Sequence, residues 1–515
     1  MMFSIIAKNM TQKSQRRYWM PWRSLALIAV LAMVIVSTTG AEQVISAQEI
    51  LAKIEGNEPV YYDSIRVLGD LDLKTLPDVR VSNSFTLTNS ILINASFDCV
   101  TFAKDAVFWG TTFGNASFKN AAFLGQADFA NTSFANATFS AASFDKSAVF
   151  DGALFQDNVS FEDALFARDA FFNEALFMGN ADFNYSDFDS YSYFAAAQFF
   201  GDALFSDVDF SGALDFSAAA VAGRANFFQS RFSSASFSNA VFSGPVQFGL
   251  ASFSGLSSFG EAIYAKEANF NLARFSQAAY FSGAEFQKDA LFGLTKFQDI
   301  ASFQSAIFDG NLNFKGGSIS TILLDKAEFS KESRIILNDT DFARIKAHWN
   351  DIAGNVVWEP ATFLALVNNY HDLGWSTDED DCYYQYRSLN QGKKQWGWSK
   401  AIDLLAWLSC GYGVRPGYAV AWSLITILAF ALLFWRGDGI RRSAKPLNEA
   451  AEEDSVPEHV TLRNALFFST MVFLSQGPID FLPVGRHRYY VILEGISGWL
   501  LLALFLVTLG RVMIR

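Results

Sequence analysis

The residues of this chain that could do chemistry stand in a short polar turn near its C-terminus. The turn reads Ser475-Gln476-Gly477-Pro478-Ile479-Asp480 and follows an apolar segment, Leu462–Leu474. Backbone carbonyls presented by such a turn can replace the water around a cation that enters a membrane. Because the turn and this short segment lie between two membrane-length apolar segments, the turn is the candidate for ion coordination in this chain.

No other residues in the sequence are spaced for catalysis or metal binding. We find no nucleophile elbow, no phosphate-binding loop and no paired carboxylates beside an obvious cleft. The histidines and cysteines are scattered along the chain: His348, His371, His459, His487, Cys99, Cys382 and Cys410. We therefore expect no enzyme, no cofactor and no bound metal, and the cysteines leave the redox compartment open.

Two membrane-length segments flank the polar turn. Gly417–Trp435 and Tyr490–Leu509 are almost entirely apolar, and each has the roughly 19–20 residues needed to cross a hydrocarbon core. The segment between them, Leu462–Leu474, is too short to cross at about 13 residues. The sequence therefore predicts a two-helix transmembrane domain over residues 413–515, with a re-entrant, pore-like segment at 460–481.

The region before these segments, residues 343–412, is richer in Trp, Tyr and charge and predicts a helical connector. Within it, Ser399–Leu408 has an apolar face with tryptophans nearby, which suits a helix lying at a membrane surface. The alternative is a helical cap that closes the domain in front of it, and one segment can do both.

The C-terminal layout resembles the two-transmembrane potassium-channel pore domain of prokaryotic channels. Asn464–Ser469 precedes the turn, Ile492–Gly495 opens the last helix, and Ala503–Phe505 lies inside that helix. The resemblance implies an ion channel that assembles as a tetramer.

The turn departs from that family at the ion filter, which in the family reads Thr-Val-Gly-Tyr-Gly-Asp. An ungapped alignment keeps Gly477 and Asp480 but puts Pro478 at the tyrosine and Ile479 at the second glycine. That glycine permits a backbone conformation that a β-branched residue strongly resists. We therefore expect no potassium filter of the usual geometry. The domain conducts another ion, conducts nothing, or serves as an oligomerising anchor.

Most of the chain ahead of these helices is a ladder of phenylalanines. From Phe97 to Phe314 a Phe, or rarely Val221 or Tyr264, recurs every five or six residues, with a small residue two places earlier. No α-helix has that period, so the pattern predicts a solenoid whose units bury their faces by stacking. The spacings give four units per coil and coils of 21 or 22 residues. One column of the predicted core stack is Phe108, Phe129, Phe150, Phe172, Phe194, Phe216, Phe237, Phe259, Phe281 and Phe303.

The ladder resembles the pentapeptide-repeat family, whose unit has a central Leu or Phe and a small residue two places earlier. The resemblance implies a mainly β fold, a right-handed quadrilateral β-helix, over residues 95–342. A solenoid of this length needs caps on its end coils. We expect residues 42–94 to form the N-terminal cap, opened by an amphipathic helix at Ser46–Glu55 with Ser46 as N-cap and Gly56 beyond its end.

The N-terminus, residues 1–41, has the pattern of a targeting segment. Basic residues precede the apolar run Leu25–Val36 and small residues follow it, as in a signal peptide or an uncleaved signal anchor. Both alternatives place the repeat outside the cytoplasm. A basic cluster after the first spanning segment favours the same orientation by the positive-inside rule; it consists of Arg436, Arg441, Arg442 and Lys445.

These signals predict a multi-pass protein of the cell membrane with an extracytoplasmic repeat domain. In that orientation the re-entrant segment enters from the cytoplasm, opposite to ordinary potassium channels. The expected partners are membrane lipid, further copies of the chain (a tetramer if the domain is channel-like) and a protein outside the cytoplasm.

The net charge of −13 is concentrated in the repeat, above all in Asp145–Phe216. Repulsion of polyanions or attraction of cations is one interpretation, and simple solubility of the outward positions is the other. We expect no nucleic-acid partner, because export separates the repeat from DNA.

Two functions remain in competition. The first is a membrane protein with a channel-like C-terminal domain, either an ion channel or a degenerate derivative, and an exported repeat. The alternative is a structural or binding rod that is anchored at the surface and does not conduct. Mimicry of a polyanion such as DNA is a third function, which the targeting segment and the two membrane-length segments disfavour.

Overall fold

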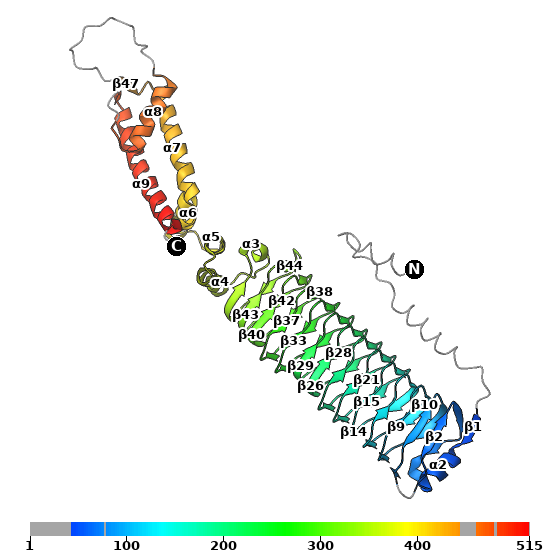
Figure 1. The fold of residues 1–515 in the computed structure, drawn as a ribbon. Coiled ribbons are helices and arrows are strands. Elements are labelled where there is room, and N and C mark those ends of the chain that lie inside the picture. The colour runs from blue at the N-terminus through cyan, green and yellow to red at the C-terminus, as the bar shows by residue number, and fades with distance from the viewer. Residues whose placement is uncertain (1–42, 77–78, 443–459, 478–480, 514–515) are drawn as a thin grey trace, which may run out of the picture.

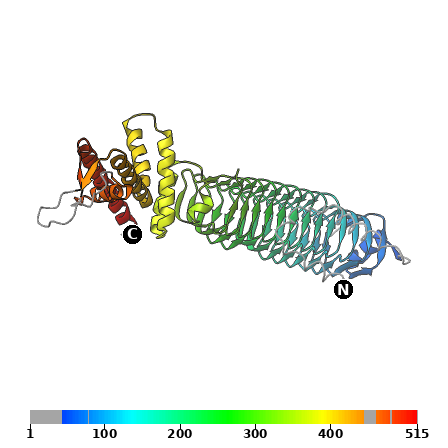
Figure 2. The same cartoon turned by 90° about the horizontal axis from the view of Figure 1, so that it is seen from above.

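The computed structural model describes residues 43–76, 79–442, 460–477 and 481–513. Within them a long β-rich rod is followed by helices (Figure 1). Figure 2 shows the coils of the rod following one another along a single axis, with the helices beyond its C-terminal end. The predicted targeting segment, residues 1–41, and the second half of the polar turn, Pro478, Ile479 and Asp480, lie outside the described residues.

The rod runs from β1 (Gln43–Ser46) to β46 (Asp341–Lys346) and is a parallel β-solenoid of about 14 turns. In the phenylalanine ladder, Phe113 pairs with Phe134, 21 residues on, and Phe155 pairs with Phe177, 22 residues on. One turn contains four short strands, for example β14 (Ser143–Phe144), β15 (Ala148–Val149), β16 (Leu154–Phe155) and β17 (Val159–Ser160). The solenoid and the coil length that the sequence predicted are confirmed.

The core of the rod is made of stacked phenylalanine rings. The ten phenylalanines from Phe108 to Phe303 that the sequence placed in one column lie one above the next. Their neighbouring ring centroids are 4.6–5.2 Å apart, except at Phe216. These distances match the spacing of neighbouring β-strands. Backbone pairing and ring stacking therefore reinforce each other along this column, except at Phe216.

The exception at Phe216 has a packing cause in the next column. There Val221 stands in register between Phe199 and Phe242, and it is much smaller than either ring. The ring of Phe216 tilts into that space, 5.7 Å from Phe199 and 6.4 Å from Phe242. Interiors are close-packed, so the volume that valine leaves is filled by a neighbour.

Tyr264 occupies the same column as Val221, between Phe242 and Phe286, and is fully buried. Its hydroxyl has no hydrogen-bond partner among the described residues, and burial raises the pKa of that hydroxyl. A buried hydroxyl without a partner costs free energy. The rod therefore tolerates tyrosine here for its ring, which stacks 4.7 Å from that of Phe286.

The front of the rod is covered by the helix that the sequence predicted, α2 (Ala47–Glu55). The Ser46 side chain accepts a hydrogen bond from the backbone N–H of Gln48, as an N-cap should. The helix ends as predicted, with Gly56 directly after Glu55. Gly56 keeps a right-handed conformation (φ −71°), and the following residue, Asn57, adopts the left-handed one (φ +56°), which asparagine tolerates well.

The other end of the rod is closed by α3 (Trp349–Ile352) and α4 (Pro360–Asp372). The side-chain amide of Asn369 accepts a hydrogen bond from the backbone N–H of Ile345 and donates one to its carbonyl, both at 2.9 Å. The Tyr370 hydroxyl donates to the carbonyl of Ala347 at 3.0 Å. These side chains satisfy backbone groups of the last coil that the next strand would otherwise pair.

Beyond the rod lie α5 (Ser376–Lys393) and α6 (Trp398–Cys410), then α7 (Pro416–Arg436), α8 (Leu462–Phe473) and α9 (His487–Met513). Helices α7 and α9 are long and apolar enough to cross a membrane, whereas α8 is shorter. Two short strands absent from the sequence prediction, β47 (Ile440–Arg442) and β48 (Phe481–Pro483), pair antiparallel.

Candidate functional site

The short helix α8 packs against both long apolar helices. Its N-terminus is capped by Thr461, whose hydroxyl accepts a hydrogen bond from the backbone N–H of Asn464. On the α7 side, the buried ring of Phe468 meets Phe434 edge to face, with centroids 5.1 Å apart. On the α9 side, the carbonyl of Phe473 lies so close to Gly498 that a Cβ there would come within 2.2 Å of it. A glycine is therefore required where α8 meets α9.

The polar turn begins as the C-cap of α8. Ser475 is left-handed (φ +57°), and its N–H donates to the carbonyl of Val472 while that of Gln476 donates to Met471. This pair of bonds is the Schellman pattern that ends many helices. Two of the six filter-like residues thus have their N–H groups committed to ending α8. The third described one, Gly477, is exposed, and a Cβ added to it would meet no atom within 4 Å.

A buried carboxylate lies beside α8, and sequence reasoning did not single it out. Glu494 of α9 is fully buried, and so is Ser469 of α8, whose hydroxyl lies within hydrogen-bond distance of it. The same hydroxyl is 2.8 Å from the carbonyl of Ile427 in α7. Ionisable groups inside apolar helical bundles are costly and usually functional. The signal available in the sequence was that Glu494 is the one acidic residue in Tyr490–Leu509.

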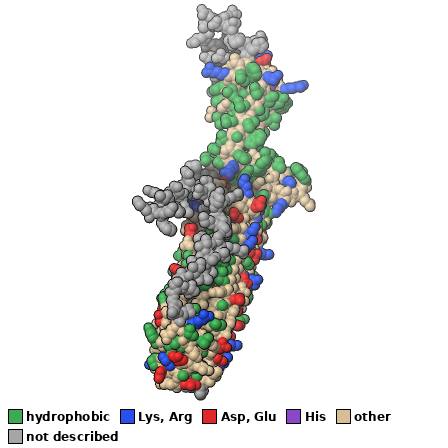
Figure 3. Space-filling model, turned by 90° about the vertical axis from the view of Figure 1, so that its right-hand side faces the viewer, with side chains coloured by type: hydrophobic (Ala, Val, Ile, Leu, Met, Phe, Trp, Pro, Cys, Tyr) green, Lys and Arg blue, Asp and Glu red, His purple; other side chains and the backbone are tan. Residues whose placement is uncertain are grey.

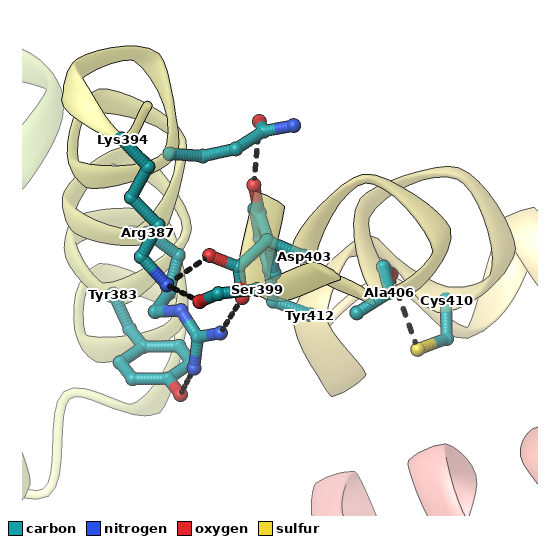
Figure 4. Close-up of polar contacts among 9 residues, drawn as sticks. Tyr383, Arg387, Lys394, Ser399, Asp403, Ala406, Cys410 and Tyr412 are labelled. Atoms are coloured by element: carbon teal, nitrogen blue, oxygen red, sulfur yellow. Dashed lines mark hydrogen bonds and ion pairs between the residues drawn. The ribbon is translucent and has the colours of Figure 1, made fainter. Parts of the chain in front are cut away.

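A second polar cluster joins the connector helices. Asp403 of α6 is nearly buried and binds Arg387 at 3.0 Å and Lys394 at 2.5 Å, while Arg387 also donates to the Tyr383 hydroxyl (Figure 4). The hydrogen bond from Lys394 holds the pKa of Asp403 below its usual range, and the Arg387 charge adds to this effect. Paired in this way, Asp403 fixes α6 against α5.

The same connector touches both long apolar helices. Arg415, just before α7, pairs with Asp381 of α5 at 2.5 Å. Arg511, near the end of α9, lies over the ring of Tyr383 at 5.1 Å, a cation–π distance. Helix α5 therefore contacts the start of one candidate span and the end of the other.

Helix α6 has the exposed apolar face that the sequence predicted for a helix at a membrane surface. Trp398, Ile402 and Leu405 are exposed on it, whereas Asp403 points into the connector. Such a division between an apolar and a polar face is typical of helices that lie in the plane of a membrane interface.

In the acidic part of the rod, carboxylates of neighbouring coils lie close to one another. Asp187 and Asp209 stand in register on neighbouring coils, and Arg231 on the next coil pairs with Asp209 at 3.1 Å. Burial raises the pKa of Asp187, and the Asp209 charge raises it further. Among the described residues, no group of three or more His, Cys, Asp or Glu side chains could hold a metal ion.

Comparison with known proteins supports the repeat. The family model described as pentapeptide repeats (9 copies) matches residues 270–318, within the rod. No curated protein and no solved structure matches the chain. The chain is thus similar to pentapeptide repeats in that stretch, and the phenylalanine ladder extends the same spacing along most of the β-solenoid.

Proposed function

We propose that the chain is an oligomeric membrane protein with a channel-like C-terminal domain and a rod outside the cytoplasm. Helices α7 and α9 span the membrane, α8 is re-entrant, and the rod is a right-handed, four-sided β-helix of pentapeptide repeats. The observation that carries the proposal is the packing of α8, too short to span, against both long apolar helices.

The strands beside α8 support its re-entrant course. The chain leaves α7 through β47 and, after α8 and the polar turn, returns through β48 before α9 begins. Because β47 and β48 pair with each other, the segment between them starts and finishes at the same end of the helices. A segment that enters and leaves on one side is the arrangement of a pore loop.

The distribution of basic residues supports the orientation. Figure 3 shows an apolar band on the helices, with Lys and Arg side chains at the end farthest from the rod and others where the helices meet the rod. The described basic residues near that end are Arg436, Arg441, Arg442, Arg463, Arg486 and Arg488, whereas Arg415 and Arg511 flank the two spans at their opposite ends. Cytoplasmic loops carry such an excess. The rod therefore belongs on the other side, in agreement with the targeting segment that the sequence predicts.

A flux assay tests this function. The full chain in lipid vesicles should pass monovalent cations without preferring potassium over sodium. The residues Pro478 and Ile479 disagree with a potassium filter. Protein-free vesicles are the control. Absence of any flux would favour the non-conducting surface rod, and a strong potassium preference would contradict the filter argument.

A further inference from the structure

The hydroxyl of Ser469 stands within hydrogen-bond distance of two oxygen atoms on the other two helices. One is the backbone carbonyl oxygen of Ile427 in α7, at 2.8 Å, and the other is Oε1 of Glu494 in α9. A serine hydroxyl has a single proton to donate, and a carbonyl oxygen can only accept. If Ser469 donates to Ile427, the bond to Glu494 exists only when the carboxyl group carries the proton.

The surroundings of Glu494 favour the same protonation state. Its side chain is fully buried, and Oε2 has no hydrogen-bond partner among the described residues. An ionised carboxylate with one neutral partner in an apolar bundle is expensive, whereas a neutral acid is not. The hydrogen-bond geometry and the burial are separate observations, and both favour a neutral carboxyl group.

Within the described parts of α7, α8 and α9, no other charged residue lies within five positions in sequence of Ile427, Ser469 or Glu494. Helix α7 has no charged residue between Gly417 and Trp435, and α8 has only Arg463, six residues before Ser469. The nearest titratable group on α9 is His487, seven residues before Glu494, and its Nδ1 contacts the carbonyl of Val484. Next to it stands Arg488.

We propose that Glu494 is a proton-binding site that joins the three C-terminal helices. The protonated carboxyl group of α9 donates to Ser469 Oγ on α8, and Ser469 donates to the Ile427 carbonyl of α7. Loss of the proton leaves two acceptors competing for one hydroxyl and a negative charge without a counter-ion. Deprotonation therefore releases α8, so that rising pH controls the position of the short helix. The site exists whether or not the protein conducts.

Infrared difference spectroscopy of the full chain in lipid vesicles tests the protonation state directly. At neutral pH the wild type should show the carbonyl band of a protonated carboxylic acid, and the band should shift in heavy water. The variant Glu494→Gln should lack it. Glu267→Gln, at an exposed position of the rod, is the matched control and should keep it. A wild-type spectrum without that band at neutral pH would overturn the proposal.

Thermal stability measured at a series of pH values is a second test, and it also shows whether the variant folds. The packed helices hold a proton that a solvated glutamate has lost at neutral pH, so the wild type should lose thermal stability as pH rises. Glu494→Gln keeps a donor toward Ser469 without charge. The thermal stability of this variant should match that of the wild type at neutral pH. It should not show the fall in stability at alkaline pH that comes from the release of α8. A Gln variant that is already destabilised at neutral pH, or one that keeps the decline, would show that the proton does not hold these helices.

Discussion

Replacement of Phe194 by alanine should lower the free energy of unfolding of its coils by about 3–5 kcal/mol, the usual cost of deleting a buried ring. The ring is fully buried and stacks on Phe172 at 4.8 Å. It also meets Phe183 and Phe205 edge to face, both at 5.5 Å. The coils above and below are held apart by their backbone pairing, so they cannot collapse into the space that the ring leaves.

Hydrogen exchange of the full chain in detergent would measure this loss, because a solenoid can open locally. Protection should fall in the coils around residues 172–216 and persist near the ends of the rod. Phe228→Ala is the matched control: the side chain is exposed on the rod surface, and such a change usually costs within about 0.5 kcal/mol. Equal effects of the two substitutions would refute the stacked core as the source of stability.

Replacement of Gly498 by valine should displace α8 and abolish most of the ion flux. A Cβ at this position would lie 2.2 Å from the backbone carbonyl oxygen of Phe473, which no side-chain rotation can relieve. Overpacking of this kind costs about 1–3 kcal/mol. If all of it opposes docking of α8, the equilibrium constant for docking falls by about 5–150-fold. The measurement is the vesicle flux, compared at equal amounts of inserted protein.

Gly510→Val provides the control on the same helix, because nothing lies within 4 Å of the position that its Cβ would take. That variant should conduct like the wild type. If Gly498→Val retained full flux, the contact between α8 and α9 would be irrelevant to conduction, and α8 would have lost its role as a pore helix.

The phenylalanine spacing was sufficient to predict the coil and the stacking order, because each unit makes the same contacts. It placed Val221 and Tyr264 in one column with Phe199, Phe242 and Phe286, and the strand registers show that column. The tilt of Phe216 into the space beside Val221 could not be predicted from the spacing. It depends on the volumes of rings in two columns, which a count along the chain does not contain.

At the ends of the rod and in the helical site, too, local contacts were predicted from the sequence and long-range contacts were not. The N-cap at Ser46 is local and was predicted, whereas the amide of Asn369 reaches Ile345, 24 residues away. The positions of α7, α8 and α9 followed from apolar runs, although α9 (His487–Met513) extends beyond the predicted Tyr490–Leu509 at both ends. The meeting of Ile427, Ser469 and Glu494 on three helices did not, because helix rotation and depth decide it and no local pattern encodes them.

The native cysteines allow the membrane orientation of the rod to be tested without an introduced cysteine. Cys99 is exposed on the rod, and Cys382 is fully buried in α5. Burial raises the pKa of the Cys382 thiol, so it stays protonated and unreactive. Cys410, at the end of α6, is also buried. Labelling of the native chain should therefore report on Cys99 alone, and Cys99→Ser should remove the signal.

The central claim is that the rod lies outside the cytoplasm. The predicted targeting segment, the basic cluster and the two apolar helices all support it. A membrane-impermeant thiol reagent added to intact cells should label Cys99. It should not label a cysteine placed at Ser443, which follows Arg442 in the sequence, until the cells are opened. If the reagent labelled Ser443→Cys but not Cys99 in intact cells, the result would contradict the account and place the whole rod in the cytoplasm.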